Sequence, residues 1–463
     1  MGKKDDVKEE VGITKRLAEF VCGQIFENIP PRVVTLAKSS ILDCIGVALF
    51  GSTHSNSKKV VSFVTSVGGH PHASVFGSSF KTSAPMAALA NGYMAHVTDW
   101  DDTIVSMRSH PSATILPAVL AVGEMLHVTG TKILEGYIVG IEVGSKVGRG
   151  VNPEHSKHWH AVGTLGCLGA AAGAAKILRL DVDETRSALG IAASEAAGLR
   201  KNKGTSAKPF HAGNAARAGV VAALLVREGL RANPDILEGQ FGFGRVYCGE
   251  KDYHPEKIVE GLGNPFEIES PGIDIKQYPS CSRTQTGIDA ILSLIEEHDI
   301  KPEEVDRIDC GVSYTTPLSL IHPNPKTGLE GQFSMGFCIS VALVDRKVGL
   351  TQFTNEKVND PRVQRLMKKF HLYIRPDLRG VESSGSNACT LKVRLRNGKE
   401  YTKSVEKSKG SAPNPLSKEE QANKFRDCAG VVLSASQIDQ CLDLVGHMED
   451  LREISQLTDI IRT

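Results

Sequence analysis

The sequence predicts a mainly α-helical fold in which a large all-helical domain carries an inserted, smaller α+β domain. Three observations lead to this fold class. Apolar residues recur at helical spacing through roughly the first 270 residues, then give way to alternating patterns, and return to helical spacing near the C-terminus. We therefore expect a helical domain at 12–272, an α+β domain at 273–410, and a C-terminal return to the helical domain at 411–463.

The helical part is clearest at Val33–Leu49, where apolar residues recur every three or four positions. Asp181 with Glu184, and Ser417 with Glu420, form capping-box patterns that open two further helices. Gly- and Ala-rich runs such as GCLGAAAGAAK predict closely packed helices, because small side chains allow the backbones of two helices to approach each other. Other stretches with helical spacing are Ala84–His96, Thr114–Leu126, Lys132–Arg149, Gly166–Leu178 and Gly213–Glu228.

The inserted domain is predicted from strand patterns. Val305–Tyr314 alternates between apolar and polar residues, and Thr390–Leu395 alternates strictly. Asn397-Gly398 follows as a hairpin signal, and Glu400–Val405 is the expected partner strand. Because small-molecule sites commonly lie between domains, a cleft between this domain and the helical domain is the expected place for a site.

The composition excludes several classes of protein. The 463 residues include 41% hydrophobic residues, enough for a large core, and 54 basic and 53 acidic residues give a net charge of +1. No broad basic field is present, so neither nucleic acid nor an anionic membrane is an expected partner. The charged start MGKKDDVKEEVG has no signal-peptide core, and the ten cysteines form no CxxC pair, which together predict a cytoplasmic protein without disulfides.

The most informative segment is His96–Thr114, which reads HVTDWDDTIVSMRSHPSAT. Acids at positions 99, 101 and 102 lie between two predicted helices, followed by Arg108 and His110. A carboxylate beside a histidine suits general acid–base catalysis, and an arginine suits binding of a substrate carboxylate. The alternative is a solvated loop with an aspartate N-cap, and chemistry alone leaves both interpretations open.

A second cluster holds three histidines, His155, His158 and His160, within six residues. It indicates a metal site, a catalytic or binding histidine, or surface histidines. No nearby cysteine or glutamate completes a zinc set, which favours the interpretations without a metal.

Two further segments carry cations. In Gly204–Ala216, Lys208 stands just ahead of a predicted helix N-terminus, where unpaired N–H groups attract a carboxylate. In KQYPSCSR, Lys276 and Arg283 lie at the predicted domain junction and could close on an anionic ligand. The alternatives are a solvated lysine and a basic hinge, and no motif around Cys281 supports a catalytic thiol.

Taken together, HVTDWDDT, HPSAT, HWHAVGTLG, GTSAKPFHAGNAARAGV and KQYPSCSRTQ resemble successive signature segments of the MmgE/PrpD family, over nearly the whole chain. The family includes 2-methylcitrate dehydratase, cis-aconitate decarboxylase and iminodisuccinate epimerase activities. The resemblance implies a helical domain with a smaller α+β lid, a homodimer, a small polycarboxylate substrate, and no metal or organic cofactor.

The resemblance also implies a set of site residues. His110 is then the acid–base group, oriented by Asp99, and His160 is a second acid or base on the opposite side of the substrate. The lysines bind carboxylates and stabilise a carbanion, whereas Asp101 and Asp102 are structural. The site residues that the resemblance implies are Asp99, Thr103, His110, His160, Lys208 and Lys276. We expect His110, His160, Asp99, Lys208 and Lys276 to be catalytic and Thr103 to bind substrate, together with Arg108 and Arg283, which their charge and position suggest.

Three departures leave the reaction open. Phe337 takes the place of a lid tyrosine in the decarboxylase branch, HPSAT replaces the HPSDN of the dehydratase branch, and the Met107-Arg108 pair is similar to the epimerase branch. We expect a cofactor-independent lyase, either a dehydratase or a decarboxylase, that removes a proton alpha to a carboxylate. The alternatives are an epimerase or isomerase of a dicarboxylate and a non-catalytic carboxylate-binding protein.

Overall fold

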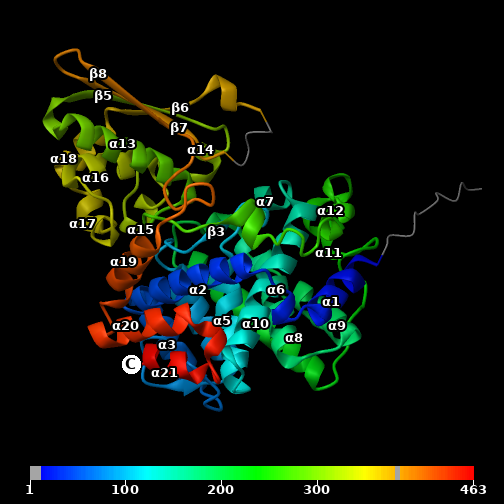
Figure 1. The fold of residues 1–463 in the computed structure, drawn as a ribbon. Helices are drawn as coiled ribbons and strands as arrows, with labels where there is room; N and C mark the ends of the chain where they lie inside the picture. The colour runs from blue at the N-terminus through cyan, green and yellow to red at the C-terminus, as the bar shows by residue number, and fades with distance from the viewer. Residues whose placement is uncertain (1–11, 381–385) are drawn as a thin grey trace, which may run out of the picture.

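The computed structural model describes residues 12–380 and 386–463 and confirms the predicted mainly α fold. Figure 1 shows a helical body with a smaller α+β part above it. The charged segment expected to precede the first helix, residues 1–11, lies outside the described residues. The exact domain boundaries, at 272 and 410, stay a prediction.

The body consists of long, mostly buried helices that share one hydrophobic core. Two short two-stranded ribbons, β1 (Ala73–Ser74) with β2 (Lys81–Thr82) and β3 (Thr103–Ile104) with β4 (Ile273–Asp274), connect its loops. Its helices are α1 (Ile13–Gly23), α2 (Pro31–Ser52), α3 (Ser55–Val67), α4 (Ala84–His96), α5 (Pro111–Met125), α6 (Gly130–Val151), α7 (His155–His158), α8 (Ala161–Leu178), α9 (Val182–Ser194), α10 (Ala207–Arg227), α11 (Phe243–Cys248) and α12 (Pro255–Val259).

The Gly-rich runs pack helices α6 and α8 closely, as the sequence predicts. A Cβ atom added at Gly140 would lie 2.7 Å from the Gly169 carbonyl oxygen, and one at Gly169 would lie 2.8 Å from the Gly140 oxygen. Gly173 is in the same position against α6, 2.8 Å from the oxygen of Gly136. Since no side chain fits at these points, the glycines set the distance between the two helices.

The lid is a four-stranded sheet in the order β6-β5-β7-β8, covered by helices on one face (Figure 1). The predicted hairpin is confirmed: β7 pairs antiparallel with β8 across a turn in which Gly398 has φ +84°. The lid elements are α13 (Gln285–His298), β5 (Val305–Val312), α14 (Thr316–Ser319), α15 (Gly328–Gly331), α16 (Met335–Asp345), α17 (Asn355–Val358), α18 (Pro361–Met367), β6 (Phe370–Ile374), β7 (Cys389–Leu395) and β8 (Glu400–Val405).

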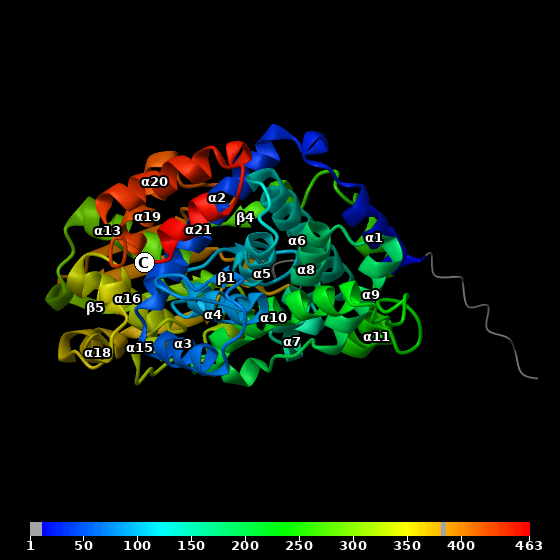
Figure 2. The same ribbon diagram turned by 90° about the horizontal axis from the view of Figure 1, so that it is seen from below.

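The chain then returns to the body through α19 (Lys418–Ala429), α20 (Ala435–Gly446) and α21 (Ser455–Ile461), which lie beside α2 in both views (Figures 1 and 2). The Phe425 ring of α19 lies directly over Gly46 of α2. Lys424 pairs with Asp43 at 2.6 Å and donates to the main-chain oxygen of Lys276 at 2.8 Å. The C-terminal helices therefore support the junction between the body and the lid.

Two body helices, α2 and α8, are long and apolar enough to cross a membrane by length and composition alone. In α8, however, 89% of the apolar window is buried inside the protein, and in α2 the value is 67%. Such burial is the ordinary situation of core helices.

Candidate active site

The segment between α4 and α5 lies inside the protein. Asp99 is 2% exposed, Asp101 0% and Asp102 1%. Asp99 has φ +52°, a left-handed conformation that aspartate tolerates better than most residues, and it turns the chain back after α4. Thr103 then pairs with Asp274 of β4, which ties the segment to the lid junction. The interpretation as a solvated loop is therefore wrong.

A cavity of about 320 Å³ opens between this segment, the body and the lid. Of the eight site residues predicted from the sequence, seven line it: Asp99, Thr103, Arg108, His110, His160, Lys208 and Arg283. Lys276 is the exception: it is buried, it is not among the residues that line the cavity, and its Nζ lies 3.5 Å from Asp99 Oδ2. The volume suits a substrate of a few carboxylate groups.

Asp99 is held by two lysines at the inner end of the cavity. Its Oδ1 accepts a hydrogen bond from Lys208 Nζ, and its main-chain oxygen accepts one from Lys276 Nζ at 2.6 Å. Burial acts to raise the pKa of Asp99, but the ammonium groups of Lys208 and Lys276 hold that pKa below its ordinary value. Asp99 is thus an ionised carboxylate with two cations beside it.

Helix α10 begins at Ala207, earlier than the sequence predicts, so Lys208 lies in its first turn. Pro209 is tolerated there because the first N–H groups of a helix have no partner within it. The Lys208 ammonium also lies 5.5 Å from the centre of the Phe333 ring of the lid. A body lysine and a lid ring therefore meet at the inner end of the cavity.

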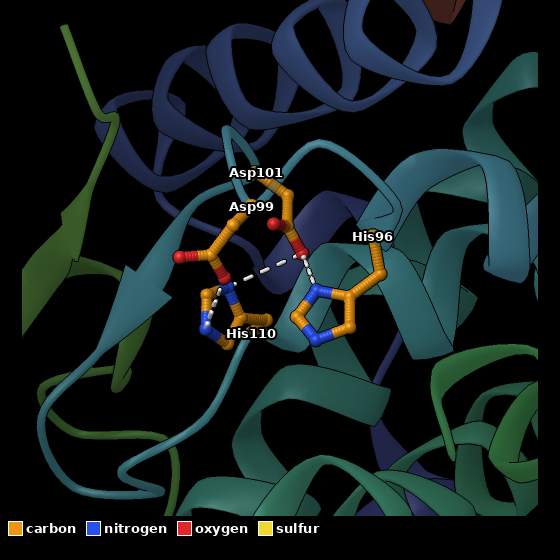
Figure 3. Close-up of side chains that lie close together, drawn as sticks. All are labelled: His96, Asp99, Asp101 and His110. Atoms are coloured by element: carbon orange, nitrogen blue, oxygen red, sulfur yellow. Dashed lines mark hydrogen bonds and ion pairs between the residues drawn. The ribbon is translucent and has the colours of Figure 1, made fainter. Parts of the chain in front are cut away.

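His110 contacts the carboxylates of both Asp99 and Asp101 (Figure 3) and lies closer to Asp101. Its Nδ1 is 3.2 Å from Asp101 Oδ2, whereas its Nε2 is 3.8 Å from Asp99 Oδ1. The same Asp101 oxygen lies 2.7 Å from Nδ1 of His96, at the end of α4. The prediction from the sequence was that Asp99 orients the His110 ring and that Asp101 is structural, whereas the distances favour Asp101 as the partner of His110. His96 was not considered at all.

The protonation of this group follows from its burial. Burial lowers the pKa of His96 to about 3, against the opposing charge of Asp101, and likewise lowers the pKa of His110. Both rings are then neutral near pH 7. Because an ionised carboxylate only accepts hydrogen bonds, each Nδ1 facing Asp101 carries the ring proton, and each Nε2 keeps a lone pair. His110 is therefore in the form of a base.

Asp102 has a different task. It accepts hydrogen bonds from the backbone N–H of Ser112, at 3.2 Å, and from the Ser112 hydroxyl. It thereby caps the first turn of α5. Burial raises the pKa of Asp102 to about 8 despite these bonds. The structural role that the sequence interpretation gave it fits this geometry.

The three histidines of the HSKHWH segment separate. His155 is buried and pairs with Thr164 at 2.9 Å, His158 is exposed beside Glu154, and only His160 lines the cavity. Burial lowers the pKa of His160 well below its ordinary value, and Lys208 acts in the same direction. The metal interpretation of this segment is wrong, because its rings point to different places.

The outer part of the cavity is strongly cationic. Arg108, with φ +50°, and Arg283 reach it from opposite domains, as the sequence predicts. Arg200 and Lys203, which the sequence interpretation missed, join them from the short turn before α10. Arg200 donates to three main-chain oxygens, including that of Leu318 in the lid at 3.0 Å. Carbonyl groups carry no net charge, so the guanidinium keeps its positive field.

The lid contributes a phenol from an unexpected place. Phe337 is fully buried, packs against Phe353 and does not line the cavity. Tyr314, which follows strand β5, lines it instead. Cys281 also lines the cavity but makes no histidine contact among the described residues. A sequence search for a tyrosine in the α16 segment could not find Tyr314.

Four of these side chains could in principle offer ligands to a metal. The ligand atoms of His96, Asp99, Asp101 and His110 all lie within 4.8 Å of one another. Asp99, however, is already neutralised by two lysine ammonium groups, which would repel a divalent cation placed beside it. The set fits proton transfer better than metal binding.

The fold and the cavity together define the class of protein. It is a helical protein with an α+β lid over a buried, cationic cavity that contains acid–base residues. Residues 15–256 match the MmgE/PrpD N-terminal domain, and residues 278–448 match the MmgE/PrpD C-terminal domain. The chain therefore belongs to the MmgE/PrpD family, and the predicted family is confirmed.

Named relatives cover almost the full length of the chain. The chain is 29% identical to the cis-aconitate decarboxylase of Mus musculus, over 97% of the chain and 93% of the relative. It is 28% identical to the cis-aconitate decarboxylase of Homo sapiens, over 97% of the chain and 94% of the relative. The cis-aconitate decarboxylase of Aspergillus terreus is 27% identical, over 98% and 97%.

Proposed function

We propose that this protein is a cofactor-independent lyase that acts on a small di- or tricarboxylate by proton transfer at a carbon next to a carboxylate. The observation that carries the proposal is the inner end of the cavity. There a neutral histidine, His110, faces an ionised carboxylate held between Lys208 and Lys276. The relatives named cis-aconitate decarboxylase support a lyase and a tricarboxylate.

In this proposal His110 moves the proton. Its Nδ1 keeps its proton, directed at Asp101, and the Asp101 carboxylate stabilises the imidazolium that forms when Nε2 accepts a second proton. Lys208, which lines the cavity, stabilises the charge that develops on the substrate carboxylate, and the field of buried Lys276 adds to this stabilisation. Both cations are already in place before substrate arrives, so little reorganisation accompanies the reaction.

The remaining carboxylates of the substrate bind at the outer part of the cavity. Arg108 and Arg283 were proposed for this from the sequence, and Arg200 and Lys203 add to the same field. Thr103 and Tyr314 supply hydrogen bonds from the two sides. A substrate with carboxylates at both ends would therefore span the cavity, one end in each region.

The branch of the family is the finer part of the proposal. A decarboxylase must deliver a proton to the carbon after carbon dioxide leaves, and a dehydratase must protonate a departing hydroxyl. Tyr314 offers a lid phenol despite phenylalanine at 337, which favours decarboxylation over the other outcomes. His160, a second histidine on the cavity, is the observation that favours the epimerase alternative.

The test is turnover of a polycarboxylate panel that contains cis-aconitate, 2-methylcitrate and chiral amino- or hydroxydicarboxylates. Release of carbon dioxide indicates a decarboxylase, and loss of water a dehydratase. Inversion at carbon without a net product indicates an epimerase. Binding of several members without any reaction would leave a carboxylate-binding protein and contradict the proposal.

The metal-free mechanism, the homodimer and the cytoplasmic location remain proposals. We expect turnover to be unchanged after dialysis against a chelator, because Lys208 and Lys276 supply the positive charge. A metal requirement would contradict the mechanism and point to the His96, Asp99, Asp101 and His110 set. Light scattering of the full chain tests the homodimer.

A further inference from the structure

Two histidines, His160 and His211, form a second histidine pair at the wall of the cavity, and the proposed mechanism assigns this pair no role. Nδ1 of His160 lies 2.8 Å from Nδ1 of His211, on α10. Of the two, only His160 lines the cavity. His211 is 8% exposed, and the centres of the two rings lie 5.0 Å apart.

The backbone holds the two rings together. The His160 N–H donates to the Gly198 oxygen at 3.0 Å, and a Cβ atom at Gly198 would lie 3.4 Å from the His211 ring. Gly198 has φ +147°, which few other residues adopt. The pair is thus enclosed by a loop that admits little movement of either imidazole.

A contact between two Nδ1 atoms can hold only one proton, because one ring must donate and the other accept. When His160 donates, its Nε2 has a lone pair and can act as a base toward a substrate in the cavity that His160 lines. When His211 donates, His160 carries its proton on Nε2 and acts as an acid. The position of the shared proton therefore decides which role His160 has.

We propose that His211 is a positioning residue that sets the tautomer of His160 and takes up its positive charge during the reaction. His160 Nε2 accepts a proton, and the His160 Nδ1 proton passes to His211 Nδ1. His160 is then neutral with a proton on Nε2, and the charge lies on His211. Return of the proton restores the starting state, so no other reactant is needed.

The surroundings favour this direction of transfer. Lys208, His96, Lys203 and His211 act on His160, and each of them disfavours a cation on its ring. Burial and the Lys208 ammonium lower the pKa of both histidines, and His96 and Lys203 act on the pKa of His160 in addition. A proton is therefore better accommodated on His211.

The test uses His211→Phe, which keeps the ring volume, and His211→Gln, which keeps a hydrogen-bonding group. The kinetic part rests on the proposed function. We expect His211→Phe to lower kcat about 10–100-fold with KM changed less than about threefold, and to shift the pH profile of kcat. His211→Gln should recover part of the loss. His155→Gln, which removes a buried imidazole outside the cavity, is the matched control and should keep kcat.

A second measurement does not depend on turnover. In ¹⁵N-histidine-labelled protein, the shared proton should give one exchange-protected Nδ1–H resonance that disappears in both His211→Phe and His160→Gln. Absence of that resonance in the wild-type protein would overturn the pairing. Wild-type kcat and pH profile in His211→Phe would overturn the role. If no polycarboxylate reacts, the proposed function is contradicted. The resonance then tests by itself whether His160 and His211 share a proton.

Discussion

The two ends of the cavity are built differently. At the inner end the charges are matched: Asp99 lies between Lys208 and Lys276, and Asp101 lies between two neutral histidines. At the outer end, Arg200 donates to three main-chain oxygens and shares the space with further cations. Matched, buried charges suit proton transfer, and excess positive charge suits binding of anions. Substitutions at the inner end should therefore change kcat, and those at the outer end should change KM.

The largest effect is expected for His110→Gln. This change removes the base but keeps a polar side chain of similar size, so kcat should fall by about 10²–10⁴-fold with little change in KM. Steady-state kinetics on the reacting polycarboxylate measure it. A KM effect alone would mean that the inner end binds substrate and does not transfer protons.

A smaller loss is expected for Asp101→Asn, because His110 keeps its place but loses the carboxylate that stabilises its charged form. We expect kcat to fall about 10–100-fold. Asp102→Asn is the matched control from the same segment, since Asp102 caps α5 and contacts neither histidine in the hydrogen bonds described. It should lower the free energy of unfolding by about 1 kcal/mol and leave the pH profile of kcat unchanged. Equal kinetic effects of the two variants would break the distinction between them.

At the outer end, Arg200→Gln should raise KM about tenfold and leave kcat nearly unchanged, because it removes one cation and one bond to the lid. The effect should shrink at high salt, which screens the field of the remaining cations. Lys157→Gln is the control: Lys157 also lines the cavity but is largely exposed and already paired with Glu154. A fall in kcat with unchanged KM in Arg200→Gln would contradict the division of roles.

The smallest effect concerns stability. His96 stays neutral in the folded protein down to about pH 3, whereas an unfolded histidine takes up a proton near pH 6.5. Between these values the unfolded state binds more protons, so the free energy of unfolding should fall as the pH decreases. His96→Asn should reduce that slope by up to about 1.4 kcal/mol per pH unit.

Urea unfolding at pH 6.5 and pH 4.5 measures the slope. His158→Gln, on an exposed histidine, should leave it unchanged. An unaltered slope in His96→Asn would contradict the neutral state of His96 in the folded protein.

Much of the fold could be predicted from local patterns. The hairpin at Gly398 and the capping boxes at Asp181 and Ser417 depend on neighbouring residues, and the structure confirms them. The parallel strand β6 could not be predicted, because it pairs with β5 some sixty residues earlier. Pairings between distant segments leave no local signal.

The site divides in the same way. The motif residues converge on one cavity, apart from Lys276, which does not line it. The choice between Asp99 and Asp101 as the partner of His110 depends on the direction in which each carboxylate points after the left-handed turn at Asp99. Arg200 and Tyr314 come from segments without a motif and meet the cavity only through the packing of the lid on the body.

The most direct test of the central claim is the fate of solvent deuterium. The wild-type protein and His110→Gln are incubated in heavy water with the reacting polycarboxylate, and NMR locates the deuterium. We predict that the wild-type protein introduces deuterium at one carbon next to a carboxylate, and that His110→Gln does so at least about 10²-fold more slowly. Equal rates of incorporation in the two proteins would contradict the assignment of proton transfer to the inner end of the cavity.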